Sequence, residues 1–461
     1  MISFSKVVDR ALTGPICTER DFDLGIFVPN LRKILVKYDI KYDPRNPVSA
    51  DDDLADRVWE AGLEFLAETG VFCPDTERRI TFSREEIDGA LATTPRPVHF
   101  GDGKDTRTVP LRRPEDKTPP WCSGSGAGPV STEQILFNVV KLYAQDSFSD
   151  GITAPAMSYV DGRDLIAGSP RGLEGAIRTI LVTREALRRA GRPGMPVVNE
   201  VATAVRSQEH IAGHRFGSVK TDYLEIGTTH ELKVDFDALN RVAYQMAAGS
   251  YGFAENGVIL GGLAGGPAGV AVVIAAYNPM DMLVLRGAVQ HPFAVPFEGG
   301  TTSNRGCMWA RNLAVQAITR HSPIPLVASG YAAAGAMTRM AYYEFTAWVI
   351  GCVVSGASVE LGPPLRGTAL DRSAPLEDIY GNAVAHASAG LSRREANKIL
   401  QALLEEYEAK LADPPLGKRY QECYDLATGE PVKEAVDLCR GVRQEMSDRF
   451  GLELPRVSPY L

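Results

Sequence analysis

Acidic side chains stand at or beside the ends of several short apolar runs, and they are the residues of this sequence best suited to chemistry. Carboxylates can hold a cationic ligand, or act as general acids where burial raises their pKa. Glycine beside such a run lets a ligand approach the backbone, although most glycines serve loop geometry. The candidate residues at these run ends are Asp150, Asn199, Glu225, Glu255, Glu298 and the stretch from Ser329 to Tyr331.

Other motifs that often carry chemistry are weak or missing. Residues 124–128 (GSGAG) lack the GxGxxG spacing of a dinucleotide loop, so we expect no nicotinamide binding. His210 and His214 are four residues apart without the glutamate of HExxH, which favours a surface or core pair over a metal site. No GxSxG elbow is present, and no cysteine has a convincing neighbouring base. We therefore expect no bound metal.

The elements that must position these residues follow a regular alternation after residue 120. Eight short apolar runs are predicted strands: residues 121–124, 151–156, 195–199, 223–228, 258–262, 293–299, 324–329 and 358–362. The stretches with helical periodicity between them are residues 132–145, 172–190, 237–248, 268–289, 304–319 and 336–354. Parallel strands need crossover helices, so this alternation predicts an α/β fold, a (β/α)₈ TIM barrel with its chemistry at the carboxyl ends of the strands.

Helical segments flank the predicted barrel on both sides. Residues 51–69 have helical periodicity behind an aspartate-rich start, and Ser83 with Glu86 forms a capping box. A polar, proline-containing stretch, 102–120, then separates this region from the barrel. Residues 392–408 form an amphipathic helix that begins with a second capping box, and 433–450 form another. The predicted organisation is an N-terminal helical and mixed extension (1–118), the barrel (119–390) and a C-terminal helical segment (391–461).

Composition excludes several classes of function. The 461 residues carry a net charge of −8 with 44% hydrophobic and 23% charged residues, which is ordinary for a globular protein and offers no basic surface for nucleic acid. The longest apolar runs, such as 269–277, are shorter than the roughly 20 residues of a membrane helix. Seven cysteines without a CxxC pair favour buried reduced thiols. We expect a cytoplasmic protein that meets neither membrane nor nucleic acid.

Several segments resemble the monomethylamine methyltransferases that pass a methyl group to a corrinoid protein. The segment AGRPGM, residues 190–195, with PVVNEVATAVRSQEHIAG after it, resembles the strand and loop that carry pyrrolysine in that family. The similarity continues in order along the chain. The other matching segments are FLAETGVFCPDT (65–76), GAGPVSTE (126–133), ELKVDFDA (231–238), ENGVILGGLAGG (255–266), AAGAMTRM (333–340) and GKRYQECYD (417–425).

The resemblance implies a TIM barrel, a homo-oligomer (a hexamer in the family), and methyl transfer from a small methylated amine to the Co(I) corrinoid of a separate carrier protein. No tightly bound cofactor is implied for this chain, because the partner protein supplies the corrinoid. The barrel mouth would be the docking surface, since cobalt must come within bonding distance of the methyl group.

The resemblance also assigns residues, with two departures. The family's catalytic glutamate matches Glu255 and its substrate-site tyrosine matches Tyr331. Val198 and Asn199 stand nearest to the position of pyrrolysine, so the electrophilic imine that captures an amine is absent, and the family's glutamine falls on Ser329. The resemblance therefore implies a pyrrolysine-independent enzyme with the acid retained.

Loss of the imine favours a donor that binds without it. A quaternary or tertiary amine can be held by carboxylates and by aromatic faces, each cation–π contact contributing roughly 0.5–2 kcal/mol. Glu255 and Glu298 are the candidate carboxylates, and Tyr223, Phe253, Phe297 and Tyr331 are the candidate aromatic residues, although core packing explains most of these rings equally well. Asp150, Asp222 and Glu225 could orient the substrate or form structural ion pairs.

The role of Glu255 and the nature of the reaction leave alternatives open. Glu255 could be the counter-charge of a methylated ammonium or the general acid that protonates the leaving amine. A folate or another low-valent acceptor could replace the corrinoid. A catalytically silent barrel that binds methylated amines or docks a corrinoid protein is the alternative from a different class.

Overall fold

The computed structural model describes residues 2–93, 98–125, 128–198, 206–228, 231–298, 301–455 and 458–460. Its centre is an eight-stranded parallel sheet in which the last strand pairs with the first, and a parallel bridge from Gln290 to Leu326 joins the two remaining edges. The sheet is therefore a closed barrel, and the predicted fold class is confirmed. The strands are β5 (Cys122–Ser125), β7 (Gly151–Thr153), β11 (Val197–Val198), β12 (Tyr223–Gly227), β13 (Tyr251–Leu260), β14 (Gly287–Pro296), β15 (Val327–Gly330) and β16 (Ser358–Leu361).

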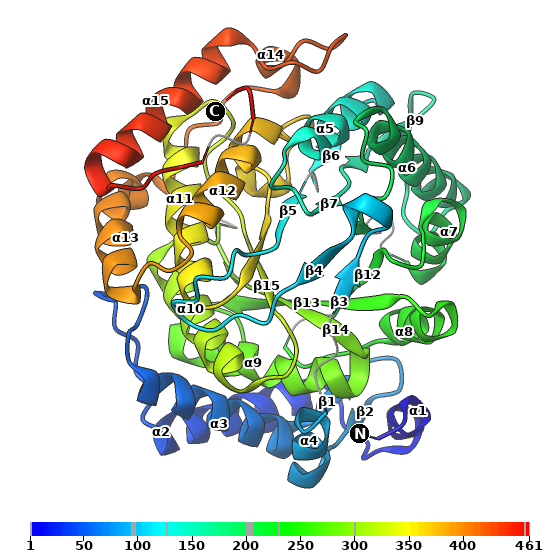
Figure 1. Cartoon of the computed structure of the whole chain (residues 1–461). Coiled ribbons are helices and arrows are strands. Elements are labelled where there is room, and N and C mark those ends of the chain that lie inside the picture. Colours follow the sequence, from blue (N-terminus) through cyan, green and yellow to red (C-terminus); the bar gives the residue numbers. More distant parts are fainter. Residues whose placement is uncertain are drawn as a thin grey trace.

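A helix follows each of these strands and surrounds the barrel (Figure 1). Two of these helices, α7 and α12, are missing from the helices predicted by periodicity. Residues of α12 are buried around its whole circumference from Pro375 to Ala385, so no polar face marks it as a helix. The helices are α5 (Glu133–Gln145), α6 (Pro170–Arg189), α7 (Ser207–Gly217), α8 (Phe236–Ala248), α9 (Pro267–Met280), α10 (Arg305–His321), α11 (Arg339–Val354) and α12 (Pro375–Ala387).

The boundary between α9 and β14 differs most from the sequence prediction. The predicted helix 268–289 ends at Met280, a π-helical turn η3 (Asp281–Leu285) follows, and Arg286 turns the chain with a φ of 56° into β14. The predicted strand began only at residue 293, because the predicted helix extended through η3 as far as residue 289. β13 likewise begins at Tyr251 instead of residue 258. Both strands are long enough to carry side chains from the barrel floor to its mouth.

An antiparallel hairpin closes the amino ends of the barrel strands. Strands β3 (Val98–Phe100) and β4 (Arg107–Val109) lie across the barrel in Figure 1 and pack an apolar cluster against its floor. Phe100 contacts Trp121, Tyr223 and Tyr251 with ring centroids 4.5 to 6.1 Å apart. This end of the barrel is therefore filled by side chains.

The N-terminal extension packs along one side of the barrel (Figure 1). Helix α3 lies against α9 and α10, and the approach is close because a Cβ atom at Gly62 would stand 2.8 Å from the side chain of Ala275. The capping box of Ser83 and Glu86 is confirmed at the start of α4. The elements are α1 (Phe4–Thr13), η1 (Asp21–Phe27), α2 (Val28–Lys37), α3 (Asp52–Thr69), β1 (Val71–Cys73), β2 (Arg78–Ile80) and α4 (Arg84–Leu91).

The C-terminal helices pack against α11 and α12. Helix α13 (Arg393–Tyr407) begins with the predicted capping box of Ser392 and Glu395, and α15 spans Lys433–Phe450 as predicted. The domain boundaries at residues 118 and 390 stay predictions. The short elements that remain are η2 (Gly103–Asp105), β6 (Pro129–Val130), β8 (Ala156–Met157), β9 (Tyr159–Val160), β10 (Arg163–Asp164), η4 (Leu365–Gly367), η5 (Glu408–Lys410) and α14 (Tyr420–Cys423).

One helical segment, Pro267–Leu285, is long and apolar enough to cross a membrane, which the shorter apolar runs of the sequence did not indicate. It is α9 together with η3, and 94% of its apolar window is buried between the barrel and the helices around it. The segment is apolar because it is a buried core helix. All seven cysteines are free and buried, as predicted.

Candidate active site

The register of β12, β13 and β14 brings three ionisable side chains into one region of the barrel. Directly paired residues of parallel strands point to the same face of the sheet. Glu255 pairs with Gly227 on one side and with His291 on the other, while Glu225 stands one layer nearer the floor, where it pairs with Phe253. Phe253 belongs to the apolar cluster of the barrel floor, so this face is the barrel interior.

Glu225, Glu255 and His291 converge, with one potential ligand atom from each within 4.8 Å of the others. His291 Nδ1 lies 3.2 Å from Glu225 Oε1, and both side chains are only 3% exposed. Burial lowers the pKa of His291 from 6.5 to about 3, so its imidazole is neutral at pH 7. Two carboxyl groups and a neutral imidazole can bind a cation or move a proton.

A ladder of rings leads from the barrel floor past this cluster to the mouth. The ring centroids of Tyr223 and Phe253 are 4.8 Å apart, and those of Phe253 and His291 are 4.9 Å apart. Phe293 continues the ladder at 6.1 Å from His291 and meets Tyr331 edge-on at 6.2 Å. The acidic cluster therefore has aromatic side chains below and above it, whereas the predicted ring of Phe297 is 74% exposed outside it.

The opposite wall of the barrel interior is also polar. Ser329 on β15 pairs with Glu360 on β16, which in turn pairs with Ser123 on β5. Glu360 is buried and accepts a hydrogen bond of 2.6 Å from Thr153 Oγ1. Ser329, the residue at the position of the family's glutamine, thus lies on the interior wall in the same row as Glu360.

Tyr331 lies in the loop after β15 and is hydrogen-bonded to the loop after β14. The N–H of Tyr331 donates to Thr302 Oγ1 at 2.7 Å, and the Thr301 hydroxyl donates to the carbonyl oxygen of Tyr331 at 3.3 Å. Glu344 on α11 is buried beneath both loops, where it accepts from Ala333 N–H (2.7 Å), Ala334 N–H (2.9 Å) and the Ser303 hydroxyl. This network sets the position of Tyr331 at the mouth.

Two predicted site residues lie at the amino end of the barrel. Asp150 and Asp222 precede β7 and β12, so their side chains sit at the starts of these strands. Asp222 is fully buried in an ion pair with Arg184 and accepts from Val197 N–H at 2.9 Å. Asp150 pairs with Arg107 at 3.3 Å, and burial raises its pKa to about 6. The structure does not bring these carboxylates together with Glu255.

The remaining predicted residues are separate from the cluster as well. Val198 is buried in the apolar floor beside Tyr223, and Glu298 is exposed in the turn after β14. Asn199 lies outside the described residues. His210 and His214 are a buried pair on α7, as predicted, with His214 Nδ1 2.9 Å from Tyr244 Oη.

His291 is the residue of the cluster that the sequence analysis missed. The predicted helix ran to residue 289 and the predicted strand began at 293, so His291 fell between elements. The period of two along a strand was the available signal, because His291 and Phe293 fall on the same face. The expectation of no bound metal, which rested on motifs within one segment, stays a prediction.

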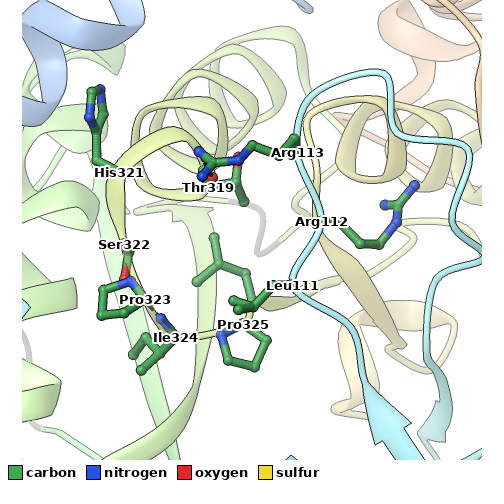
Figure 2. A pocket seen from close by; sticks show the side chains of 10 residues that line it. Leu111, Arg112, Arg113, Thr319, His321, Ser322, Pro323, Ile324 and Pro325 are labelled. Carbon is green, nitrogen blue, oxygen red and sulfur yellow. Dashed lines mark hydrogen bonds between the residues drawn. The ribbon is translucent and has the colours of Figure 1, made fainter. Parts of the chain in front are cut away.

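A surface cavity of about 260 Å³ lies at the amino end of β15, away from the mouth (Figure 2). Two of its lining residues, Arg112 and Arg113, bind backbone carbonyls at the ends of the surrounding helices. Arg112 donates to Val353 at 2.9 Å, and Arg113 donates to Thr319 at 3.0 Å and to Arg320. These guanidinium groups satisfy helix C-termini and are explained by the fold.

Comparison with known proteins identifies relatives over the whole chain. The sequence model of monomethylamine methyltransferase MtmB matches residues 2–452. Monomethylamine methyltransferase MtmB of Methanosarcina mazei is 30% identical over 443 residues, which cover 95% of this chain and 96% of the relative. The crystal structure of the Methanosarcina barkeri monomethylamine methyltransferase (MtmB) superposes with a TM-score of 0.93 at 29% identity, covering 98% of each chain. A crystal structure of a hydroxylamine complex of MtmB gives the same values.

Proposed function

Because this chain belongs to the monomethylamine methyltransferase MtmB family and is thus a methyltransferase, we propose that it transfers a methyl group from an N-methylated amine to the Co(I) corrinoid of a separate carrier protein. The observation that supports the site most strongly is the convergence of Glu225, Glu255 and His291 inside the barrel. The corrinoid protein would dock at the mouth, where Tyr331 lies.

The donor in this proposal is a tertiary or quaternary amine that binds without pyrrolysine. The printed sequence contains only the twenty standard residues, so no side chain of this chain offers the electrophilic imine. Two carboxylates and the rings of Phe253, Phe293 and Tyr331 supply the negative charge and the aromatic faces that attract a methylated nitrogen.

The reaction is a displacement that the site must align. The Co(I) electron pair forms the Co–C bond while the C–N bond breaks and its electron pair stays on nitrogen. Holding the methyl carbon in line with cobalt lowers the activation barrier, because the reacting atoms are already positioned when the donor is bound. Glu255 acts as counter-charge for a quaternary donor, which leaves as a neutral amine, or as the acid that protonates a tertiary donor's nitrogen.

The test mixes the purified chain with a reduced corrinoid carrier and a panel of donors: monomethylamine, trimethylamine and a tetramethylammonium salt. We expect the absorbance change from Co(I) to methyl-Co(III) with trimethylamine or the quaternary salt, and little with monomethylamine. No change with any donor would refute the proposed transfer.

Two further arms separate the alternatives. Transfer to tetrahydrofolate without a corrinoid carrier would replace the acceptor in the proposal. Calorimetric binding of a methylated amine without turnover on either acceptor would favour a silent binding protein. Light scattering of the same preparation tests the expected homo-oligomer.

A further inference from the structure

We propose that Glu225, Glu255 and His291 bind one divalent transition-metal ion, with Zn²⁺ as the representative case, inside the mouth of the barrel. This inference rests on the proposed function and deepens it, because a metal at this site selects the chemical class of the methyl donor.

The three side chains have the composition of a metal site with an open position. They come from adjacent strands β12, β13 and β14, and one nitrogen or oxygen of each lies within 4.8 Å of the others. Catalytic zinc sites use three protein ligands drawn from imidazole and carboxylate, with a fourth position left for water or substrate. No other group of three or more His, Cys, Asp or Glu side chains converges in this way within the described residues.

The state of His291 is the second observation. Its Nε2 atom is buried and has no hydrogen-bond partner among the residues that the structure describes, which is costly for a polar atom unless a ligand fills the place. Its Nδ1 atom lies 3.2 Å from Glu225 Oε1, so these two proposed ligands already contact each other. The neutral imidazole is the form that binds a metal.

The surroundings leave a way for a donor to reach the metal. Glu225 and His291 are almost fully buried, whereas Glu255 is only partly buried and stands nearer the carboxyl end of the barrel. Phe253 below and Phe293 above keep the ligands in place and make the site apolar around its polar centre. A metal bound here would expose its open position toward the mouth.

The chemistry balances with water as the proton source. The metal would bind the lone pair of a neutral tertiary amine at its fourth position and would take up a water as a fifth ligand, whose pKa falls to about 7 on such a metal. The Co(I) electron pair forms the bond to the methyl carbon, the C–N bond breaks, and its electron pair remains on nitrogen. The bound water gives a proton to that nitrogen, so a secondary amine leaves and hydroxide stays on the metal.

The metal therefore excludes a quaternary donor. A quaternary ammonium has no lone pair for the metal, and a divalent cation neutralises the charge of the two carboxylates that would otherwise attract it. A donor for this site is therefore an amine with a free lone pair on nitrogen.

The test measures metal binding by the full-length chain, independently of methyl transfer. Chelator-treated protein is titrated with Zn²⁺ in a calorimeter, and Co²⁺ is added to a parallel sample to record its visible spectrum. We expect one ion per chain and a Co²⁺ spectrum without a thiolate charge-transfer band, since the cysteines are not ligands. The variants Glu255→Gln and His291→Gln should bind Zn²⁺ at least about 10-fold more weakly.

Matched controls keep the titration specific. Glu405 is an exposed glutamate on α13 and His99 is an exposed histidine on β3, so Glu405→Gln and His99→Gln should bind Zn²⁺ as the parent chain does. Absence of binding by the parent chain, or equal affinity in the site variants, overturns the metal site. If a site variant does not fold, the Co²⁺ spectrum of the parent chain is the deciding measurement. The strong visible bands of a four-coordinate ion support the site, and the weak bands of an ion held by six oxygen atoms overturn it.

The two proposals fail in different experiments. Unchanged methyl transfer from trimethylamine after chelator treatment, or turnover of a quaternary salt, would overturn the metal while the proposed function stands. Zn²⁺ binding without methyl transfer from any donor would overturn the proposed function while the metal site stands.

Discussion

Buried carboxylates lie at both ends of the barrel, but their neighbouring side chains differ. At the amino end, Asp105 pairs with Arg192 and Asp222 pairs with Arg184, and the β3–β4 hairpin fills the space with apolar side chains. Toward the carboxyl end, Glu225 and Glu255 lie beside each other and beside a neutral His291. An arginine partner makes a carboxylate part of the scaffold, whereas acids grouped with an imidazole retain the capacity to bind a ligand.

The largest expected effect is on catalysis at the carboxyl end. Glu255→Gln keeps the shape of the side chain but removes its charge and its acidity. We expect kcat/KM for the identified donor to fall about 10²–10⁴-fold, while the thermal midpoint of unfolding stays close to that of the parent. Glu405→Gln on the exposed surface is the control. Turnover equal to that of the control would remove Glu255 from the mechanism.

The matching effect at the amino end is on stability. Asp222→Ala leaves the partly buried Arg184 without its carboxylate and removes the acceptor of Val197 N–H. We expect the free energy of unfolding to fall by about 3–5 kcal/mol in denaturant titrations. Glu185→Ala is the control, because Glu185 pairs with arginines at the surface, where water screens the ion pairs. Equal small losses in both variants would contradict the structural role of Asp222.

The pH dependence of stability isolates the imidazole at the carboxyl end. His291 stays neutral in the folded chain down to a pKa of about 3, but in the unfolded chain it takes up a proton near 6.5. The unfolded chain therefore binds more protons, and the stability contributed by His291 falls as the pH drops below that value. Between pH 7 and pH 5 this loss is about 2 kcal/mol.

His291→Gln is the variant that measures it. The free energy of unfolding is measured at pH 7 and pH 5 with a chelator present. Its decrease between these two pH values should be smaller in the variant than in the parent chain by about 2 kcal/mol. Identical pH profiles would mean that His291 takes up its proton at the same pH in the folded and in the unfolded chain, which contradicts a neutral imidazole in the folded chain at pH 5.

A smaller effect is expected where α11 supports the mouth. Glu344→Gln places amide hydrogens where the carboxylate accepts from Ala333 and Ala334 N–H, and it weakens the network around Tyr331. We expect unfolding to become easier by about 1–2 kcal/mol and KM for the donor to rise more than kcat falls. Glu344→Asp, which keeps the acceptor charge, should recover part of KM. A loss of stability with KM unchanged would make Glu344 purely structural.

The smallest effect belongs to the surface cavity of Figure 2, at the amino end. Arg113→Ala removes hydrogen bonds to the carbonyls of Thr319 and Arg320 at the C-terminus of α10. We expect a loss of about 1 kcal/mol in the free energy of unfolding and unchanged donor turnover. A change in turnover larger than the loss of folded protein would assign this end of the barrel a role in the reaction.

Much of the scaffold could be predicted because its signals are local. The capping boxes at Ser83 and Ser392 satisfy backbone groups within one helical turn, so four consecutive residues are enough to recognise them. The alternation of short apolar runs and helices likewise predicts the barrel, because parallel strands require crossovers. Where a helix is buried all round, as α12 is, the local signal vanishes and the prediction fails.

The position of a residue before or after a strand in the sequence also predicts the end of the barrel at which it lies. Asp150 and Asp222 come before their strands, and residues before a strand lie at its amino end. Residues at both ends of a strand border an apolar run, so these aspartates were predicted to lie with the residues of the carboxyl end. Strand direction, applied residue by residue, separates them.

By itself, the sequence determined the (β/α)₈ fold and the ends of most helices, and through resemblance it predicted Glu255 and Tyr331 as site residues. Only the tertiary structure decided that Glu225 and His291 stand beside Glu255. The physical reason is that neighbours across parallel strands are set by hydrogen-bond register, and a shift of one residue would turn every side chain to the other face. That register depends on the packing of the whole barrel, and no local pattern of residues encodes it.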